Sequence, residues 1–102
     1  MGRRLNLHEK LCELLGNENV YFQPPASVKM SYPAIRYRLY AIDNTHADNE
    51  PYLQDYGYEL TLIHKDPDND VVEKLAKLPY CRFNRYYAAD NLNHYVFVLY
   101  TH

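Results

Sequence analysis

An acidic run at 66–70 (DPDND) is the first candidate for a ligand-binding site in this 102-residue chain. Its alternating aspartates have the spacing of a calcium-binding loop. However, Val71 stands where such a loop needs a turn glycine, and Lys77 stands where it needs the closing bidentate glutamate. Acidic residues also favour the positive end of a helix dipole. We therefore interpret the run as the start of a helix.

Other catalytic or cofactor-binding patterns are missing from the sequence. Ser27 and Ser31 lie outside any nucleophile-elbow pattern, and three glycines are too few for a phosphate-cradling loop. Cys12 and Cys81 lack metal-ligand spacing and are predicted to be buried thiols in a reducing compartment. The histidines show neither a pair four residues apart nor zinc-type spacing with cysteine. They are His8, His46, His64, His94 and His102. We predict no enzyme activity, no cofactor and no metal site.

Basic side chains are the remaining candidates for binding. Four arginines are predicted to share a sheet face: Arg36, Arg38, Arg82 and Arg85. An RNA-binding sheet would interleave aromatics with them, and Tyr37 and Tyr86 are candidates. Strand alternation, however, places Tyr37 opposite its two neighbouring arginines. The net charge is −2, so we do not predict a nucleic-acid-binding protein.

Two helices are predicted to position these residues. Leucines at helical spacing predict the first over about 6–15, with Asn6 and Glu9 as its capping box and Gly16 at its end. The second is predicted over about 68–78, with Asp70 and Glu73 as its capping box. Each helix carries one apolar stripe, so each should pack one face on a sheet.

Extended segments are predicted at about 20–22, 34–40, 56–64, 81–87 and 92–101. The order predicts a single α+β domain over 1–102. Its sheet should be mainly antiparallel or mixed, with four to five strands and both helices on one face. Pro24 and Pro25 should leave the first strand at an edge. The last strand is apolar on both faces, so it should be central or covered by a neighbouring subunit. Residues 41–55 are polar and predicted to form a loop.

Tyrosine supplies twelve of the 102 residues. These side chains either line the sheet, which strands favour, or form a surface that another subunit buries. We expect a protein made in a cytoplasm and not associated with a membrane, because no signal-peptide core is seen and the apolar run at 95–100 is too short to span a bilayer.

Several strings, spread along the chain from residue 20 to residue 94, resemble tail-terminator (tail-completion) proteins of bacteriophages with long, non-contractile tails. They are 20–25 (VYFQPP), 30–35 (MSYPAI) with Tyr37, 47–49 (ADN) with Tyr52, 78–86 (LPYCRFNRY) and 89–94 (ADNLNH). The strings indicate a lineage and carry no catalytic motif.

This resemblance implies a structural protein that forms a ring, usually of six copies, at the head-proximal end of the tail tube. The ring ends tube polymerisation and docks the tail to the head connector. Its partners would be other copies of itself, the tail tube protein, and a connector or stopper protein. DNA would pass through the lumen without specific binding. The implied location is the head–tail junction of the virion, with assembly in the host cytoplasm.

We further predict that the polar segment 41–55 contacts the tail tube, because a long loop in a small domain is usually functional. The candidate interaction residues are Asn44, His46, Asp48, Asn49, Tyr52, Phe22 and Tyr100. Three alternatives stay open. The first alternative is another head–tail junction protein (head-completion, stopper or neck adaptor). The second is a small enzyme or toxin, such as a nuclease using His and Tyr, and the third is a regulatory protein that binds host factors.

Overall fold

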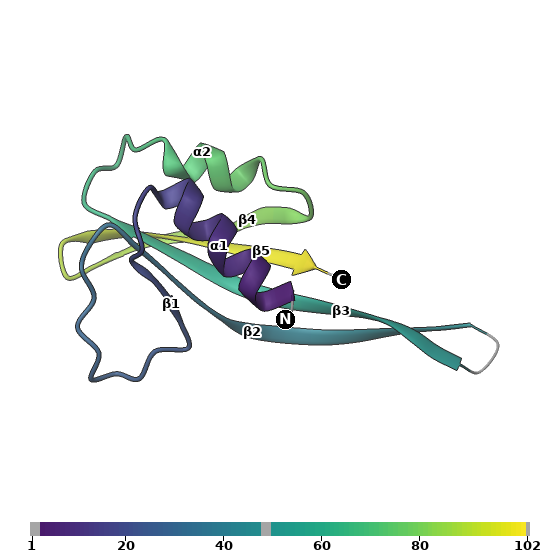
Figure 1. The fold of residues 1–102 in the computed structure, drawn as a ribbon. Coiled ribbons are helices and arrows are strands. Elements are labelled where there is room, and N and C mark those ends of the chain that lie inside the picture. The colour runs from purple at the N-terminus through teal and green to yellow at the C-terminus, as the bar shows by residue number, and fades with distance from the viewer. Residues whose placement is uncertain (1–2, 48–49, 102) are drawn as a thin grey trace.

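A five-stranded sheet with two helices on one face forms the body of the protein (Figure 1). The structure is a computed structural model that describes residues 3–47 and 50–101. Its elements in chain order are α1 (Arg3–Leu15), β1 (Val20–Phe22), β2 (Ala34–Ala47), β3 (Glu50–His64), α2 (Val71–Ala76), β4 (Cys81–Ala89) and β5 (Leu92–Thr101). The predicted α+β class is confirmed.

The strands lie in the order β1-β2-β3-β5-β4. β1 runs parallel to β2, and every other neighbouring pair is antiparallel, so the sheet is mixed. β5 lies between β3 and β4, which explains why its sequence is apolar on both faces. The strands at the two ends of the sheet, β1 and β4, have a partner on only one side within the described part of the chain.

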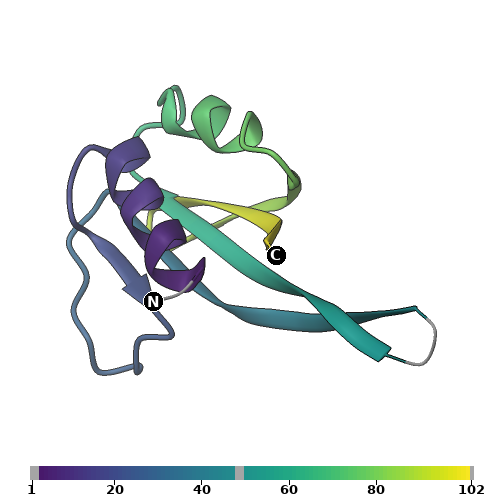
Figure 2. The same ribbon diagram turned by 45° about the vertical axis from the view of Figure 1, so that its right-hand side comes forward.

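The hydrophobic core lies between the helices and one face of the sheet (Figure 2). Leu11 of α1 and Leu75 of α2 are completely buried there, as are Leu60 of β3 and Phe97 of β5. The predicted apolar stripes of both helices therefore do pack on a sheet. Gly16 ends α1 with a positive φ of 85°, and its N–H donates to the carbonyl of Cys12, as predicted for a left-handed helix end.

The side chain of Tyr37 links β2 to α1 through hydrogen bonds. Its ring is buried in the core, and its hydroxyl oxygen lies 2.8 Å from Nδ1 of His8. Arg4 donates to the same oxygen at 3.4 Å, which leaves the phenol proton free to be donated to His8. Burial raises the pKa of Tyr37 above its ordinary value, although Arg4 acts in the opposite direction. The neutral hydroxyl therefore joins two residues of the helix to the strand.

Replacing Tyr37 with Phe should lower the free energy of unfolding by about 1 kcal/mol, the usual net value of one hydrogen bond, because the ring packing is kept. Urea denaturation measures this. Tyr86→Phe is the matched control, since the Tyr86 hydroxyl donates to Asn93 at an exposed site and its loss should cost less than about 0.5 kcal/mol. Equal losses in the two variants would contradict the role assigned to Tyr37.

Both predicted capping boxes are wrong. α1 begins at Arg3, so Asn6 lies inside the helix and cannot cap it. α2 spans only Val71–Ala76, shorter than the predicted 68–78, and the side chain of Asp70 makes no capping hydrogen bond. Instead, Oδ1 of Asn69 accepts from the backbone N–H groups of Val71 (3.1 Å) and Val72 (3.2 Å). The side-chain amide of Asn69, one residue before Asp70, therefore caps the first turn of α2. The Asp70 carboxylate instead forms an ion pair with Lys74.

The largest correction concerns 41–55, predicted as a loop. β2 and β3 continue far past the predicted limits of 40 and 56 and pair as one long hairpin as far as Ala47 and Glu50. β5 accompanies β3 only from Tyr56 onward. The outer part is therefore a two-stranded ribbon that projects from the body, and the molecule measures 51 × 26 × 23 Å (Figure 1, Figure 2). Neither helix lies on this ribbon, so pairing there needs no apolar pattern.

β4 is also longer than predicted, ending at Ala89 and not at 87. Its register with β5 shifts between Phe83 and Arg85, where one extra residue forms a bulge. Side chains normally alternate between the faces of a strand, so this extra residue inverts the alternation beyond it. Arg82 and Arg85 consequently lie on the same face of the sheet, and each is paired with a residue of β5: Arg82 with Val98 and Arg85 with Val96.

Candidate functional site

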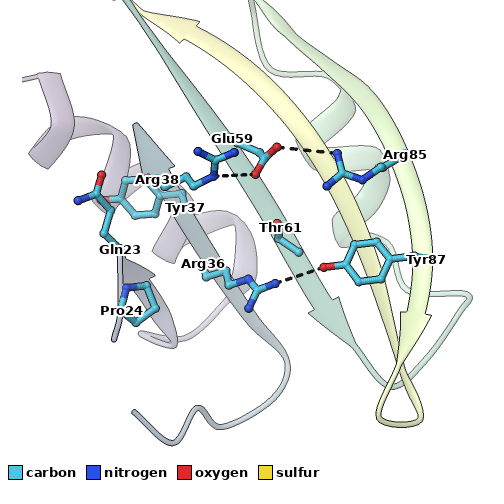
Figure 3. A pocket seen from close by; sticks show the side chains of 9 residues that line it. All are labelled: Gln23, Pro24, Arg36, Tyr37, Arg38, Glu59, Thr61, Arg85 and Tyr87. Atoms are coloured by element: carbon cyan, nitrogen blue, oxygen red, sulfur yellow. Dashed lines mark hydrogen bonds and ion pairs between the residues drawn. The ribbon is translucent and has the colours of Figure 1, made fainter. Parts of the chain in front are cut away.

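The face of the sheet away from the helices carries a cluster of polar side chains from three strands (Figure 3). Arg36 and Arg38 come from β2 and pair in register with Thr61 and Glu59 of β3. β4, two strands further along, contributes Arg85 and Tyr87. This polar cluster is defined by these six residues: Arg36, Arg38, Glu59, Thr61, Arg85 and Tyr87.

Side chains from the outer strands of the cluster meet above the strands between them. Arg36 of β2 donates from Nη2 to the hydroxyl of Tyr87 on β4 at 3.2 Å, although β3 and β5 separate their backbones (Figure 3). Neighbouring strands lie about 4.8 Å apart, so this contact spans about 14 Å of sheet. Thr61 and Val96, on the two strands crossed, are both buried. The long side chains thus shield the middle of this face from water.

Glu59 joins two of the arginines. Its Oε1 lies 2.9 Å from Nε of Arg38, and its Oε2 lies 3.8 Å from Nη1 of Arg85 (Figure 3). The Glu59 side chain is 14% exposed, whereas those of Arg38 and Arg85 are 56% and 55% exposed. A carboxylate this shielded is stable only with cationic or hydrogen-bonding partners. Glu59 therefore holds the two exposed guanidinium groups on either side of itself.

The cluster lines a pocket of about 240 Å³. Gln23 and Pro24, which follow β1, lie at the β2 side of this pocket (Figure 3). Gln23 has a positive φ of 45° and is fixed by two hydrogen bonds to β2: its N–H donates to the carbonyl of Tyr37, and its Oε1 accepts from the N–H of Leu39. On the other side, the Tyr87 ring stacks on buried His94 with centroids 4.6 Å apart. Both sides of the pocket are thus built from anchored groups.

The sequence predicted part of this cluster. Arg36, Arg38 and Arg85 do share a face, and Arg82 lies on that face outside the pocket, as predicted from the residues. Tyr37 lies on the core side, as alternation required. Tyr86 points to the helix side, where its ring packs at 5.2 Å from that of Tyr95, so it is not interleaved with the arginines.

The sequence did not single out Glu59, Thr61 or Tyr87 as site residues, and Tyr87 was the least predictable of the three. Its place depends on the bulge in β4 and on the position of β5 between β3 and β4. Neither feature leaves a clear pattern in the residues, although the polar Asn84 inside an otherwise regular strand sequence stands where the register shifts.

The predicted interaction residues fall into three groups. Asn44, His46 and Tyr52 lie along the backbone of the projecting ribbon, where Asn44 pairs with Gln54 and His46 with Pro51. Asp48 and Asn49 lie outside the described residues.

Phe22 and Tyr100 lie elsewhere. Phe22 packs against Tyr37 with ring centroids 5.0 Å apart, and the Arg4 guanidinium lies 4.5 Å above its ring. It therefore belongs to the margin of the core. Tyr100 is half-buried over Gly57, where an added Cβ would lie 2.8 Å from the Tyr100 ring. The structure does not bring these two aromatics and the ribbon residues together into one site.

A second surface lies along β4. Phe83 and Tyr86 are each 50% exposed, and Tyr80, just before the strand, is 72% exposed. The two strand residues are stacked against β5, with the Phe83 and Phe97 rings in a T-shape 5.5 Å apart. Within residues 3–47 and 50–101, no strand pairs with the outer edge of β4. We call this strand, with its exposed aromatics, the β4 edge.

The described residues hold no group of three or more His, Cys, Asp or Glu side chains placed to bind a metal ion. Across the same residues, no helix has the length and apolar character needed to cross a membrane. Both cysteines are free thiols. Burial raises the pKa of the Cys81 thiol from 9.0 to about 11, and it also raises the pKa of Cys12.

Cys81 should be unreactive in the folded protein. Thiolate is the reactive form, and each unit of pKa lowers its fraction tenfold below the pKa, so a Cys12→Ser variant should react with an aromatic disulfide about 100-fold more slowly at pH 8 folded than unfolded in urea. The folded rate should keep rising with pH until about pH 11, whereas the unfolded rate should level off near pH 9. Equal rates in the two states at pH 8 would contradict this assignment.

Comparison of the sequence with protein-family models and with curated proteins finds no match in either case.

Proposed function

We propose that the chain is a non-catalytic structural protein of a long-tailed bacteriophage, forming a ring at the head-proximal end of the tail tube. The ring ends tube polymerisation and docks the tail to the head connector. This proposal starts from the resemblance of the sequence strings to tail-terminator proteins. The structural observation that supports it best is the β2–β3 ribbon, which projects away from the folded body.

The ribbon is suited to contact a second protein. β5 pairs with β3 only from Tyr56 onward, and the helices cover only the body of the sheet (Figure 1). The backbone of the outer ribbon consequently extends beyond the layers of the body, and a projecting segment of this kind is best explained by an interaction. We place the tail-tube contact on this ribbon, which contains Asn44, His46 and Tyr52.

The sheet also offers two edges for self-assembly. β1 ends one side of the sheet, where Pro24 and Pro25 follow it, and the β4 edge ends the other. Different surfaces that meet head to tail produce a closed ring when the rotation between subunits closes. Strand pairing across subunits would cover both edges, and the exposed aromatics Phe83 and Tyr86 are of the type enriched at interface cores. A ring of six copies is the expected assembly.

Electron microscopy of lysates from a phage lacking this gene tests the proposal. Overlong tails beside separate, DNA-filled heads are the expected result, because tube growth would continue without a terminator. Tails of normal length beside emptied heads would overturn the terminator role and favour a head-completion or stopper protein. Normal virions would contradict any role at the head–tail junction. Complementation with the gene on a plasmid is the control.

A further inference from the structure

The polar cluster carries an excess of positive charge. Arg36, Arg38 and Arg85 each bring one positive charge to the pocket, and Glu59 is the single acidic residue among those that line it. The balance within the described lining residues is therefore two positive charges. A free phosphate dianion would neutralise this excess, and one phosphodiester group, with a single negative charge, would neutralise half of it.

The cluster also has unused hydrogen-bond donors. An arginine has five N–H donors. Among the described contacts, Arg36 donates from one nitrogen to Tyr87 and Arg38 from one nitrogen to Glu59, while Arg85 forms an ion pair with Glu59 at 3.8 Å. Because Tyr87 accepts from Arg36, its own hydroxyl proton remains to be donated. Phosphate oxygens are acceptors, and guanidinium groups bind them in a bidentate way.

These donors are held in place before any ligand arrives. Glu59 fixes Arg38 and Arg85, and Tyr87, stacked on His94, fixes Arg36. Glu59 would repel an anion on its own, but its carboxylate is shielded between the two guanidinium groups. Its role is thus that of a positioning residue. Less ordering of side chains on binding means a smaller entropic cost and a tighter complex.

The size of the pocket limits its ligand. At about 240 Å³ it is smaller than the clefts of about 300–1,000 Å³ that hold drug-sized molecules. It therefore suits one charged group better than a whole nucleotide. We propose that this pocket binds a phosphate group, carried either by a small free anion or by a phosphodiester backbone. This inference does not depend on the ring or on the ribbon.

Titration of the full chain with inorganic phosphate at constant ionic strength, followed by NMR, tests the site. Saturable shifts of the Arg36 and Arg85 side-chain Nε–H signals are expected. Arg36→Gln and Arg85→Gln should each weaken phosphate binding about tenfold or more, because a charge-assisted hydrogen bond contributes about 1.5–3 kcal/mol. Urea midpoints close to wild type would show that both variants fold.

Arg82→Gln is the matched control, because Arg82 lies on the same strand and the same face but outside the pocket. It changes the net charge equally and should alter phosphate affinity less than about twofold, since Arg82 has no bond to the ligand to lose. Equal weakening by Arg82→Gln and Arg85→Gln would show diffuse attraction and overturn the proposal. Shifts that never saturate would overturn it as well.

A 12-base-pair DNA duplex distinguishes the source of the phosphate. If DNA binds, competes with inorganic phosphate and is weakened by Arg85→Gln but not by Arg82→Gln, the site takes a backbone phosphate. If inorganic phosphate saturates the site and the duplex does not bind, the ligand is a small free anion. DNA binding that is insensitive to inorganic phosphate and equally sensitive to both variants would overturn the backbone source.

Discussion

Phe97→Ala should lower the free energy of unfolding by about 3–5 kcal/mol, because removing a buried aromatic side chain loses its transfer free energy and leaves a cavity. Phe97 is 0% exposed and lies on β5, between β3 and β4. Domains of this kind have a total stability of about 5–15 kcal/mol, so this single truncation should remove a large share of it. A lowered urea midpoint with an unchanged denaturant slope would establish the effect.

Phe83→Ala is the control for that experiment. Phe83 stacks on Phe97 but is half exposed at the β4 edge, so its removal should cost about 0.5–1.5 kcal/mol, the typical value of an aromatic pair. Similar losses in the two variants would contradict the placement of Phe97 at the centre of the core and of Phe83 at its exposed margin. The same variant should also weaken self-assembly if the β4 edge forms the subunit interface.

Shortening the ribbon should abolish binding to tail tubes while leaving the domain folded. Asp43 and Asp55 are paired directly, so residues 44–54 can be replaced by Asn-Gly, the preferred two-residue hairpin turn. We expect affinity for purified tail tubes to fall by at least about 100-fold, roughly 2.7 kcal/mol, if the ribbon supplies the main contact. Cosedimentation with tubes measures the loss, and the urea midpoint should stay close to wild type.

A second variant separates the length of the ribbon from its side chains. His46→Ser with Tyr52→Ser keeps every backbone pair of the hairpin, so weakened binding here would assign the contact to side chains on the ribbon. If the double serine variant still binds and the shortened protein does not, the tail-tube contact depends on the backbone and the length of the ribbon. Wild-type binding by the shortened protein would show that the tail-tube contact lies elsewhere.

The elements that bury one face were predictable from the sequence. Ile35 and Tyr37 alternate with Arg36 and Arg38, so both the strand and its two faces followed from the residue pattern. The same logic fails for the ribbon. Where no helix covers a pair of strands, burial does not constrain the side chains, and a polar sequence reads as a loop. The backbone hydrogen bonds of the hairpin hold it without that signal.

The candidate site was only partly predictable for a topological reason. Alternation places Arg36 and Glu59 on the polar face of their strands, but it does not say which strands are neighbours. Tyr87 reaches Arg36 because β5 lies between β3 and β4 and because a bulge inverts the facing of β4. Both features are decided by packing of the whole sheet. A substitution at Asn84 that removes the bulge would therefore turn Arg85 and Tyr87 to the opposite face.

A bulge in β2 lies at the base of the ribbon. The register of β2 and β3 shifts between Leu39 and Ala41, close to Tyr56, where β5 stops accompanying β3. From Ile42 to Ala47 the ribbon runs roughly 17 Å at about 3.3 Å per residue. A change in backbone angle at the bulge would therefore rotate the whole ribbon about that point. A rotation of about 10° there moves the far end by roughly 3 Å, about the rise of one strand residue. Tyr40 is the extra residue at this bulge. Its deletion should therefore change the direction of the ribbon without altering any residue at the far end.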